Sequence, residues 1–248
     1  MRKYIVCLIG MVIAISAPAQ KEIEQANEAY TQGDFNKAVE LYQQAIEKNG
    51  ISAGIYYNMG NSYYRLNQIA PAILYYERSL LLSPGNKDTR SNLEIARLNA
   101  VDKIEPVGEF FLAEGYNAVK NLYSTDQWSY MAIGCFLLAL IGLSFFFFSR
   151  KILLKKMGFY AALVFLVFCL LANTFAFNQK KMLTHRNTAI IFSPTTTLKS
   201  SPDNSGTDLF ILHEGTKVEV KNKLGEWNEI ETADGNVGWI KSNEIEII

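Results

Sequence analysis

Two long uncharged apolar runs constrain this 248-residue chain more than any other feature. Residues 128–149 and 157–178 are each 22 residues long and contain no Asp, Glu, Lys or Arg. A helix of about 20 apolar residues crosses the hydrocarbon core of a bilayer and satisfies its own backbone hydrogen bonds there. The alternative, a pair of helices in a soluble core, would have to bury the run Phe145–Phe148 completely. The sequence therefore predicts a transmembrane hairpin over residues 128–178.

The segment that joins the two runs indicates the orientation of this hairpin. Residues 150–156 carry four basic side chains, at positions 150, 151, 155 and 156, and no acidic one. Basic residues concentrate in cytoplasmic loops, so the loop 150–156 is expected inside the cell and both flanking regions outside the cytoplasm. Ser124–Gln127 has the pattern of a capping box ahead of the first span. Because the only ionisable groups in the spans are the thiols of Cys135 and Cys169, ion or proton transport is a poor hypothesis.

The N-terminus has the form of a secretory signal peptide, residues 1–19. Arg2 and Lys3 precede an apolar stretch over 4–15, and Ala17–Ala19 offers a small-x-small cleavage site. An uncleaved anchor is the alternative, and either form exports the residues that follow. The third cysteine, Cys7, lies in this signal, so the aqueous segments contain no cysteine for a disulfide framework or a thiolate metal site.

The exported segment repeats itself with a period of 34 residues. When Gly33 is aligned with Asn67, small residues align with small ones and large aromatic residues with each other, as for the pair Tyr42 and Tyr76. Such a period is typical of helix pairs that stack into a solenoid. The stretches Tyr56–Tyr64 and Ala72–Leu80, followed by Pro84, resemble the two helices of the tetratricopeptide repeat.

This resemblance implies an all-α domain over residues 20–103. Two repeats, the first over about 22–50, would be followed by a capping helix at about Asp88–Leu98. In this family the first helices line a concave surface, and side chains outside the core can contact a peptide there. The positions expected in this partner-binding groove are Asn27, Tyr30, Tyr57, Asn58, Asn61, Tyr64 and Arg65.

Two details limit what this groove is expected to do. Tyr57 and Tyr64 can equally be packing residues of the solenoid. The carboxylate-binding members of the family have cationic residues on the third helix, whereas this chain has Asp88 and Asn92 at the comparable positions. A clamp for a C-terminal carboxylate is therefore not expected.

Residues 104–127 form a juxtamembrane amphipathic segment. Its apolar residues, among them Leu112, Tyr116 and Val119, have helical spacing. A helix on the membrane surface and a helix docked on the repeats both explain this pattern, and both alternatives stay open.

From residue 187 onward the chain changes to short alternating runs separated by turn signals. Strands are expected at 189–192, 197–199, 209–212, 217–221, 227–231 and 238–240, with a hairpin turn at Asp234-Gly235. Five or six strands in about 60 residues suggest an SH3-like barrel over 187–248. The spacing of Gly225, Trp227, Gly235, Gly238 and Trp239 resembles a bacterial SH3 domain.

The SH3 resemblance implies binding of cell-wall peptides or partner proteins. The expected ligand surface is made by Trp227 and Trp239. We expect Trp227 mainly in the core and Trp239 in the core or in a ligand groove. The net charge of −4 over residues 186–248 disfavours anionic polymers and leaves peptides open.

No constellation in the chain announces catalysis. His185 and His213 have no nearby cysteine with which to form a metal site or a nucleophilic pair, and no phosphate-binding glycine loop is present. No block is basic enough for nucleic acid. The expected fold class is thus a multidomain membrane protein with helical repeats, a two-helix hairpin and a small β-barrel. No enzyme activity, cofactor or metal is expected.

The order signal, repeats, hairpin and SH3-like domain resembles the BatE-type family of aerotolerance-operon proteins. This resemblance implies an inner-membrane scaffold with both soluble domains in the periplasm. Its partners would be membrane proteins with von Willebrand factor A-type domains, in a complex linked to oxidative stress. The alternative function is a cell-wall tether or sensor that binds peptidoglycan peptides through the SH3-like domain.

Overall fold

The computed structural model describes residues 17–104, 108 and 111–248, with only the backbone of residues 17–20. The expected signal peptide falls almost entirely on residues 1–16, outside the described residues. The described chain divides into two compact units. One contains the N-terminal helices up to residue 80, residues 86–108 and the C-terminal residues 187–248, and the other contains residues 81–85 and 109–186.

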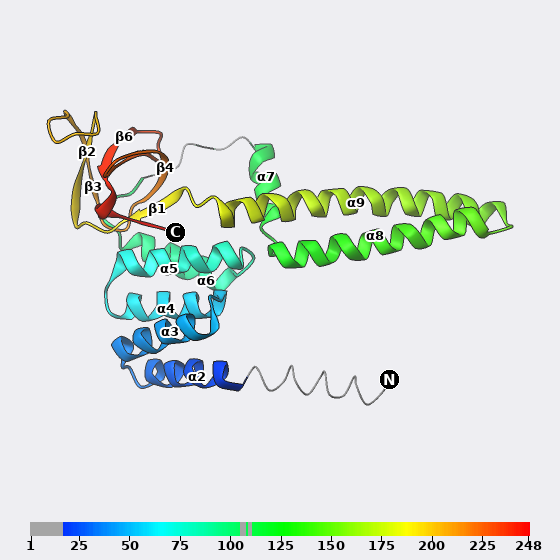
Figure 1. Cartoon of the computed structure of the whole chain (residues 1–248), viewed down its shortest axis with the longest axis horizontal. Helices are drawn as coiled ribbons and strands as arrows, with labels where there is room; N and C mark the ends of the chain where they lie inside the picture. Colours follow the sequence, from blue (N-terminus) through cyan, green and yellow to red (C-terminus); the bar gives the residue numbers. More distant parts are fainter. Residues whose placement is uncertain (1–16, 105–107, 109–110) are drawn as a thin grey trace. The chain divides into compact units, whose positions relative to one another are not determined.

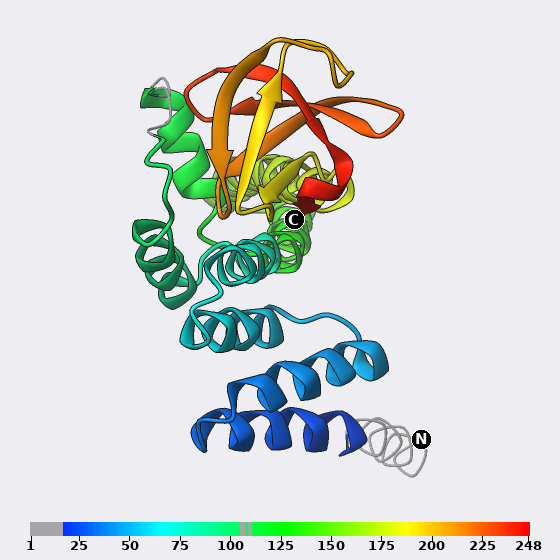
Figure 2. The same cartoon turned by 90° about the vertical axis from the view of Figure 1, so that its left-hand side faces the viewer.

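The first unit begins with five helices that stack in sequence order (Figures 1 and 2). They are α2 (Ala17–Thr31), α3 (Phe35–Asn49), α4 (Ala53–Arg65), α5 (Ile69–Leu82) and α6 (Lys87–Leu98). We call α2–α6 the repeat region. Asp34, Ser52 and Asn86 cap α3, α4 and α6, because each side-chain oxygen accepts a hydrogen bond from a backbone N–H three residues later. The predicted capping helix at 88–98 is α6.

The 34-residue period has a direct backbone counterpart. Gly33, between α2 and α3, and Asn67, between α4 and α5, are aligned by the period, and both have a positive φ, 82° and 59° respectively. Glycine and asparagine are the residues that adopt this conformation most easily. The alignment of small with large residues is explained by Gly60, where a Cβ atom would lie 2.6 Å from the ring of Tyr76. The two helices of this pair pack closely only because residue 60 has no side chain.

The second unit is a helical hairpin preceded by a short helix. Its elements are α7 (Phe111–Lys120), α8 (Thr125–Phe148) and α9 (Ile152–Thr184). The predicted capping box is confirmed: the Ser124 side chain accepts from the Gln127 N–H, and the Gln127 side chain accepts from the Ser124 N–H. Both α8 and α9 are long and apolar enough to cross a membrane. Outward side chains such as Phe148 (86% exposed) and Leu170 (62% exposed) remain uncovered, which argues against a soluble core.

The loop of the hairpin is shorter than predicted. Helix α9 begins at Ile152, so only residues 149–151 connect the helices, and Lys155 and Lys156 belong to the start of α9. The sequence placed the boundary where the charges end, but lysine is a good helix former and does not end a helix.

Glycine residues let α8 and α9 pack closely. A Cβ atom on Gly142 would lie 2.8 Å from the Gly158 carbonyl oxygen, and one on Gly158 would lie 2.5 Å from the Gly142 carbonyl oxygen. Ala162 also faces Gly142. Small residues at such a contact allow two helix backbones to approach, as in many membrane helix pairs.

The C-terminal residues form a curved antiparallel sheet of seven strands with the order β3-β2-β6-β5-β4-β1-β7 (Figure 2). The strands are β1 (Thr188–Ile191), β2 (Thr195–Lys199), β3 (Asp208–His213), β4 (Lys217–Leu224), β5 (Trp227–Thr232), β6 (Val237–Lys241) and β7 (Ile245–Ile247). All six predicted strands are present, and the predicted turn at Asp234-Gly235 joins β5 to β6. The additional strand is β7, which is three residues long and pairs with β1.

The concave side of this C-terminal sheet holds its core. Its buried residues are Ala189, Ile191, Leu198, Leu212, Val218, Ile230, Ile240 and Ile245. Gly238 is required for this packing, because a Cβ atom there would lie 2.7 Å from the side chain of Leu198. Alternation along β5 and β6 turns every second side chain away from this core.

Candidate functional site

One hydrogen-bonded arrangement occurs twice along the first helices of the repeat region. In the first copy, the Asn27 side-chain oxygen accepts from the Tyr42 hydroxyl at 2.6 Å and from the Asn58 amide at 3.2 Å. In the second copy, the Asn61 side-chain oxygen accepts from the Tyr76 hydroxyl at 2.7 Å and from the Asn92 amide at 2.9 Å. Each member of the second copy is 34 residues after its counterpart. We call these two sets the asparagine ladder.

The tyrosines of the asparagine ladder are core residues with one polar atom. Tyr42 and Tyr76 are 1% exposed, so their hydroxyls need partners inside the protein, and Asn27 and Asn61 provide them. Burial raises the pKa of the Tyr42 hydroxyl to about 12 and raises the pKa of Tyr76 further still. Both hydroxyls are therefore neutral donors at any physiological pH.

The asparagine ladder leaves half of each amide group for a ligand. Within the described residues, the side-chain N–H groups of Asn27 and Asn61 make no hydrogen bond, and neither do the side-chain oxygens of Asn58 and Asn92. Asn27 is exposed and the other three are half-buried. The surface thus presents both donors and acceptors at a regular spacing, which suits the backbone of an extended peptide.

A cavity of about 210 Å³ opens beside the second copy of the ladder. Its lining residues are Tyr30, Asn61, Tyr64, Arg65, Tyr76, Asn92 and Ile95. Four of the seven predicted groove residues thus line one cavity: Tyr30, Asn61, Tyr64 and Arg65. Asn27 and Asn58 form the first copy of the ladder, and Tyr57 lies outside the lining with its hydroxyl accepting from Asn92 at 3.2 Å.

The one cationic side chain in this lining is held by aromatic rings. The Arg65 guanidinium lies over the ring of Phe35, 4.7 Å from its centroid, and Phe35 packs edge-on against Tyr30. The Tyr64 hydroxyl accepts a hydrogen bond from Asn99 at 3.3 Å. Arg65 therefore stands at the cavity in a fixed position, from which it can bind a carboxylate or a peptide carbonyl.

Sequence reasoning missed three residues of this cavity: Tyr76, Asn92 and Ile95. Tyr76 was aligned with Tyr42 by the 34-residue period, which showed a packing role but not its hydroxyl contact. Asn92 was considered only as a missing cation, although the same period aligns it with Asn58. Ile95 is 47% exposed, and its position after Asn61 in the period was available as a signal.

The two predicted ligand-surface tryptophans of the C-terminal sheet lie on the same outward face. On β5 the buried residues are Asn228, Ile230 and Thr232, so Trp227 points away from the core and is half-buried. The expectation that Trp227 belongs to the core is therefore wrong, because strand alternation places its neighbours there instead. Trp239 is also half-buried and outward, opposite Glu229. The Lys241 ammonium lies 5.7 Å from the centroid of the Trp227 indole.

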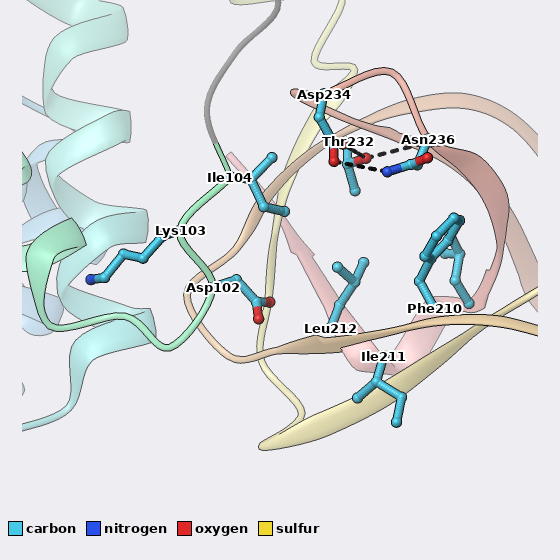
Figure 3. Close-up of a pocket in the computed structure, with 10 residues that line it drawn as sticks. Asp102, Lys103, Ile104, Phe210, Ile211, Leu212, Thr232, Asp234 and Asn236 are labelled. Atoms are coloured by element: carbon cyan, nitrogen blue, oxygen red, sulfur yellow. Dashed lines mark hydrogen bonds between the residues drawn. The ribbon is translucent and has the colours of Figure 1, made fainter.

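A second cavity, of about 220 Å³, opens at the other side of the C-terminal sheet (Figure 3). Leu198, Phe210 and Leu212 form its apolar part, and Ile104 approaches from the chain that follows α6. Its polar rim is closed on itself, because Asp234 accepts from both the Thr232 hydroxyl and the Asn236 amide. Lys103 points away and donates to carbonyls at the end of α6, including that of Leu98. This cavity offers shape and few free polar groups.

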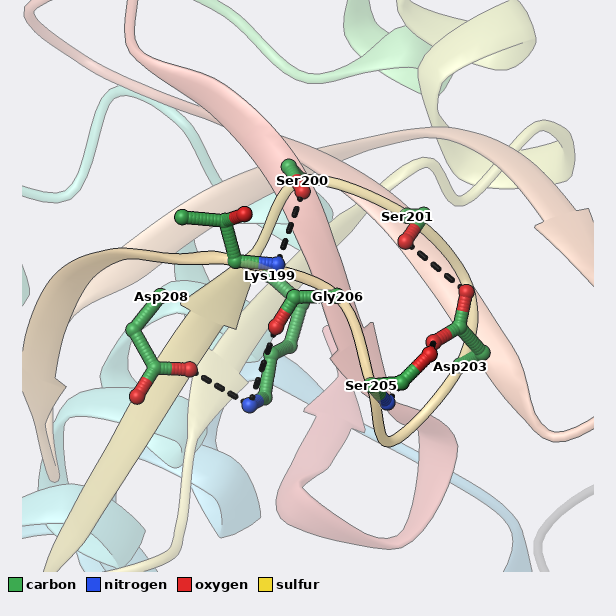
Figure 4. A network of polar contacts seen from close by, with 8 residues as sticks. Lys199, Ser200, Ser201, Asp203, Ser205, Gly206 and Asp208 are labelled. Atoms are coloured by element: carbon green, nitrogen blue, oxygen red, sulfur yellow. Dashed lines mark hydrogen bonds and ion pairs between the residues drawn. The ribbon is translucent and has the colours of Figure 1, made fainter.

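The connection from β2 to β3 is stabilised by its own side chains (Figure 4). Asp203 accepts from the Ser201 hydroxyl at 2.8 Å and from the Ser205 backbone N–H at 2.7 Å. Hydrogen bonds from Ser205 and Ser201 hold the pKa of Asp203 below its usual value. Lys199 pairs with Asp208 at the base of the loop. These carboxylates are structural and not poised for proton transfer.

A buried carboxylate joins the repeat region to the C-terminal sheet within the first unit. Glu77 of α5 is 7% exposed and pairs with Arg97 of α6 and with Lys217 of β4, the latter at 2.8 Å. Burial opposes ionisation, but the charges of Lys217 and Arg97 outweigh it and hold the pKa of Glu77 below its usual value. Asp102 makes a similar link by accepting from the His213 N–H and the Thr216 hydroxyl, both at 2.7 Å.

Within the described residues, no group of three or more His, Cys, Asp or Glu side chains is arranged to hold a metal ion.

Comparison with known families agrees with the repeat geometry. Residues 26–67 match the family model described as TPR repeat, and residues 53–86 match the model described as tetratricopeptide repeat. No curated protein matches the sequence of this chain. The segment from 26 to 86 thus consists of tetratricopeptide repeats, which indicates a scaffold for protein–protein interaction.

Proposed function

We propose that this chain is a membrane-anchored, non-catalytic scaffold that binds an extended segment of a partner protein in the groove of its repeat region. The observation that carries the proposal is the asparagine ladder. Its amides are positioned by buried tyrosines, so their remaining donors and acceptors are ordered before a ligand arrives. Ordered polar groups bind an extended backbone with a smaller loss of side-chain entropy.

The membrane part of the proposal rests on α8 and α9. Both helices have the length and composition of spans, their outward side chains are apolar, and their contact is made by glycine and alanine. The basic residues at 150, 151, 155 and 156 favour a cytoplasmic turn. Both soluble parts would then lie in the periplasm, anchored at the bacterial inner membrane.

The C-terminal sheet is proposed as a second binding module, an SH3-like barrel. Its support is the outward face that Trp227 and Trp239 share with Lys241, since aromatic rings at a polar surface are typical of peptide-binding faces. A role within an aerotolerance complex, with von Willebrand factor A-type membrane proteins as partners, follows from the family resemblance of the chain's organisation.

The groove proposal is tested by in-cell cross-linking and affinity purification of the full chain from membranes. Substituting Asn58 or Asn61 would disturb the buried tyrosines, so the test variant is Tyr64→Ala/Arg65→Ala/Ile95→Ala. The matched control, Lys37→Ala/Gln43→Ala/Glu47→Ala, changes three exposed side chains of α3. We expect the groove variant to lose at least about 90% of a specific cross-linked partner, since hot-spot losses of 2 kcal/mol or more are common at such sites.

Equal recovery of the partner by the groove variant, the control and the unmodified chain would show that the groove is not the binding surface. The same purification with Trp227→Ala/Trp239→Ala then tests the C-terminal sheet. Sedimentation of the full chain with purified cell wall tests the alternative of a cell-wall tether, which fails if Trp227→Ala/Trp239→Ala sediments as well as the unmodified chain.

A further inference from the structure

We propose that α7 lies in the plane of the membrane surface, with its apolar side inserted between lipid headgroups. This inference rests on the proposed membrane insertion of α8 and α9. It decides between the two alternatives that the sequence left open for residues 104–127.

Helix α7 has an exposed apolar side that nothing in the second unit covers among the described residues. Leu112 is 62% exposed and Val119 is 44% exposed. The two residues are seven apart, so they lie within about 20° of each other around the helix axis. Glu114 lies on the opposite side, about 160° from Leu112. A helix with one apolar and one charged side is typical of segments that bind a membrane interface.

The position of α7 along α9 coincides with the end of the apolar run. This run ends at Asn178, and Gln179, Lys180 and Lys181 follow. The Tyr116 hydroxyl of α7 accepts a hydrogen bond from Asn178, and its ring lies 5.4 Å from that of Phe175. Helix α7 is therefore attached where α9 changes from apolar to charged residues, which is the depth of the headgroups in a membrane.

The corner between α7 and α8 is fixed by a buried amide. Gln179 is 5% exposed and donates to the carbonyl oxygens of Lys120 at 2.6 Å and Tyr123 at 2.8 Å. The Trp128 indole N–H also donates to the Lys120 carbonyl, at 2.9 Å. These bonds satisfy carbonyls that the end of α7 leaves without helical partners. The apolar side of α7 is thus held at a set depth and is not carried on a loose linker.

Lipid is the occupant that these observations favour. Through the contact of Tyr116 with Phe175, the apolar side of α7 continues into the apolar surface of α9. The exposed cations Lys180, Lys181 and Arg186 lie just beyond this level, where they can contact lipid phosphates. A surface that continues the membrane-facing surface of the hairpin is covered by the same bilayer.

The test uses the full chain reconstituted in lipid nanodiscs, with its three native cysteines replaced by serine. A single environment-sensitive NBD fluorophore is attached to Leu112→Cys, Val119→Cys, Glu114→Cys or Leu140→Cys. Lipids with a nitroxide near the headgroup or deep in the acyl chain are the membrane quenchers, and iodide is the aqueous quencher. Position 114 is the matched control on α7, and position 140 reports on the span itself.

We expect shallow nitroxide lipids to quench positions 112 and 119 about threefold more than position 114, with iodide showing the reverse order. Position 140 should be quenched by the deep nitroxide. Quenching at 140 without preferential quenching at 112 and 119 overturns the placement of α7 alone. This includes the result in which 112 and 119 are shielded from both lipid and iodide, which would indicate a protein surface. No quenching at 140 overturns the membrane hairpin and the placement of α7 with it.

Discussion

At the scale of single residues, the groove depends on hydroxyl groups that never contact a ligand. Asn61 faces the cavity, but its orientation is set by Tyr76, whose hydroxyl is buried beneath it. The period in the sequence identified the tyrosine as a packing residue. Its role in orienting Asn61 was not predictable, because the contact spans 15 residues and depends on how α4 packs on α5.

Substitution Tyr76→Phe should therefore weaken both folding and binding. Removing the hydroxyl leaves the Asn61 oxygen with only the Asn92 amide as partner, at a cost of about 1–2 kcal/mol. Thermal unfolding followed by far-ultraviolet circular dichroism should show a melting temperature lower by about 3–6 °C. Tyr56→Phe is the control, since the Tyr56 hydroxyl makes no hydrogen bond among the described residues. An equal loss in both variants would contradict a special role for the Tyr76 hydroxyl.

At the scale of elements, the hairpin shows which features local sequence determines. The start of α8 was predictable because a capping box involves only Ser124 and Gln127 and their own backbone. The start of α9 was not, because Lys151 makes no side-chain cap and the helix simply resumes after a three-residue turn. The glycine contact between the helices was likewise invisible, since Gly134 and Gly142 look equivalent in the sequence.

Gly158→Val should separate the two helices, whereas Gly134→Val should not. A Cβ atom at 158 would lie 2.5 Å from the Gly142 carbonyl oxygen, while one at 134 would meet nothing within 4 Å. Overpacking of this kind costs about 1–3 kcal/mol. Thermal denaturation of the detergent-solubilised chain should show lower stability for Gly158→Val alone. If both variants behave alike, α8 and α9 are not held together at this contact.

At the scale of the whole molecule, the compact units do not follow the domain order of the sequence. Residues 86–108 and 187–248 belong to one unit, although the hairpin separates them in the chain. Glu77 and Lys217, 140 residues apart, form an ion pair, and Arg78 donates to the Ile247 carbonyl and pairs with Glu246 at 2.9 Å. The repeat region and the C-terminal sheet, predicted as independent domains, are thus connected by charged contacts.

Lys217→Met should destabilise this connection and change its pH dependence. Because the folded-state pKa of Glu77 is lowered, its ion pairs contribute stability above the unfolded-state pKa of about 4.3, and this stability is lost as the pH falls through the lower folded value. Without Lys217 the folded pKa rises toward the unfolded value. The cost at neutral pH is about 1.5–3 kcal/mol, and the further loss on acidification is smaller than in the unmodified chain.

Melting temperatures at pH 7 and about pH 4, followed by tryptophan fluorescence, measure both effects. Lys223→Met is the control, because Lys223 forms no ion pair among the described residues. Parallel pH profiles for Lys217→Met and the unmodified chain would mean that Glu77 does not depend on Lys217.

The sequence by itself determined the 34-residue repeat, the two apolar helices, six of the seven strands and the groove surface on the first helices. Each of these follows from periodicity or turn chemistry within a few neighbouring residues. Tertiary structure alone decided that Asn92 joins Asn61, that Glu77 meets Lys217, that Trp227 faces outward, and that α7 is fixed at Asn178 and Gln179. These contacts join residues that are far apart in the chain, so their energy depends on how whole elements pack and not on any local pattern.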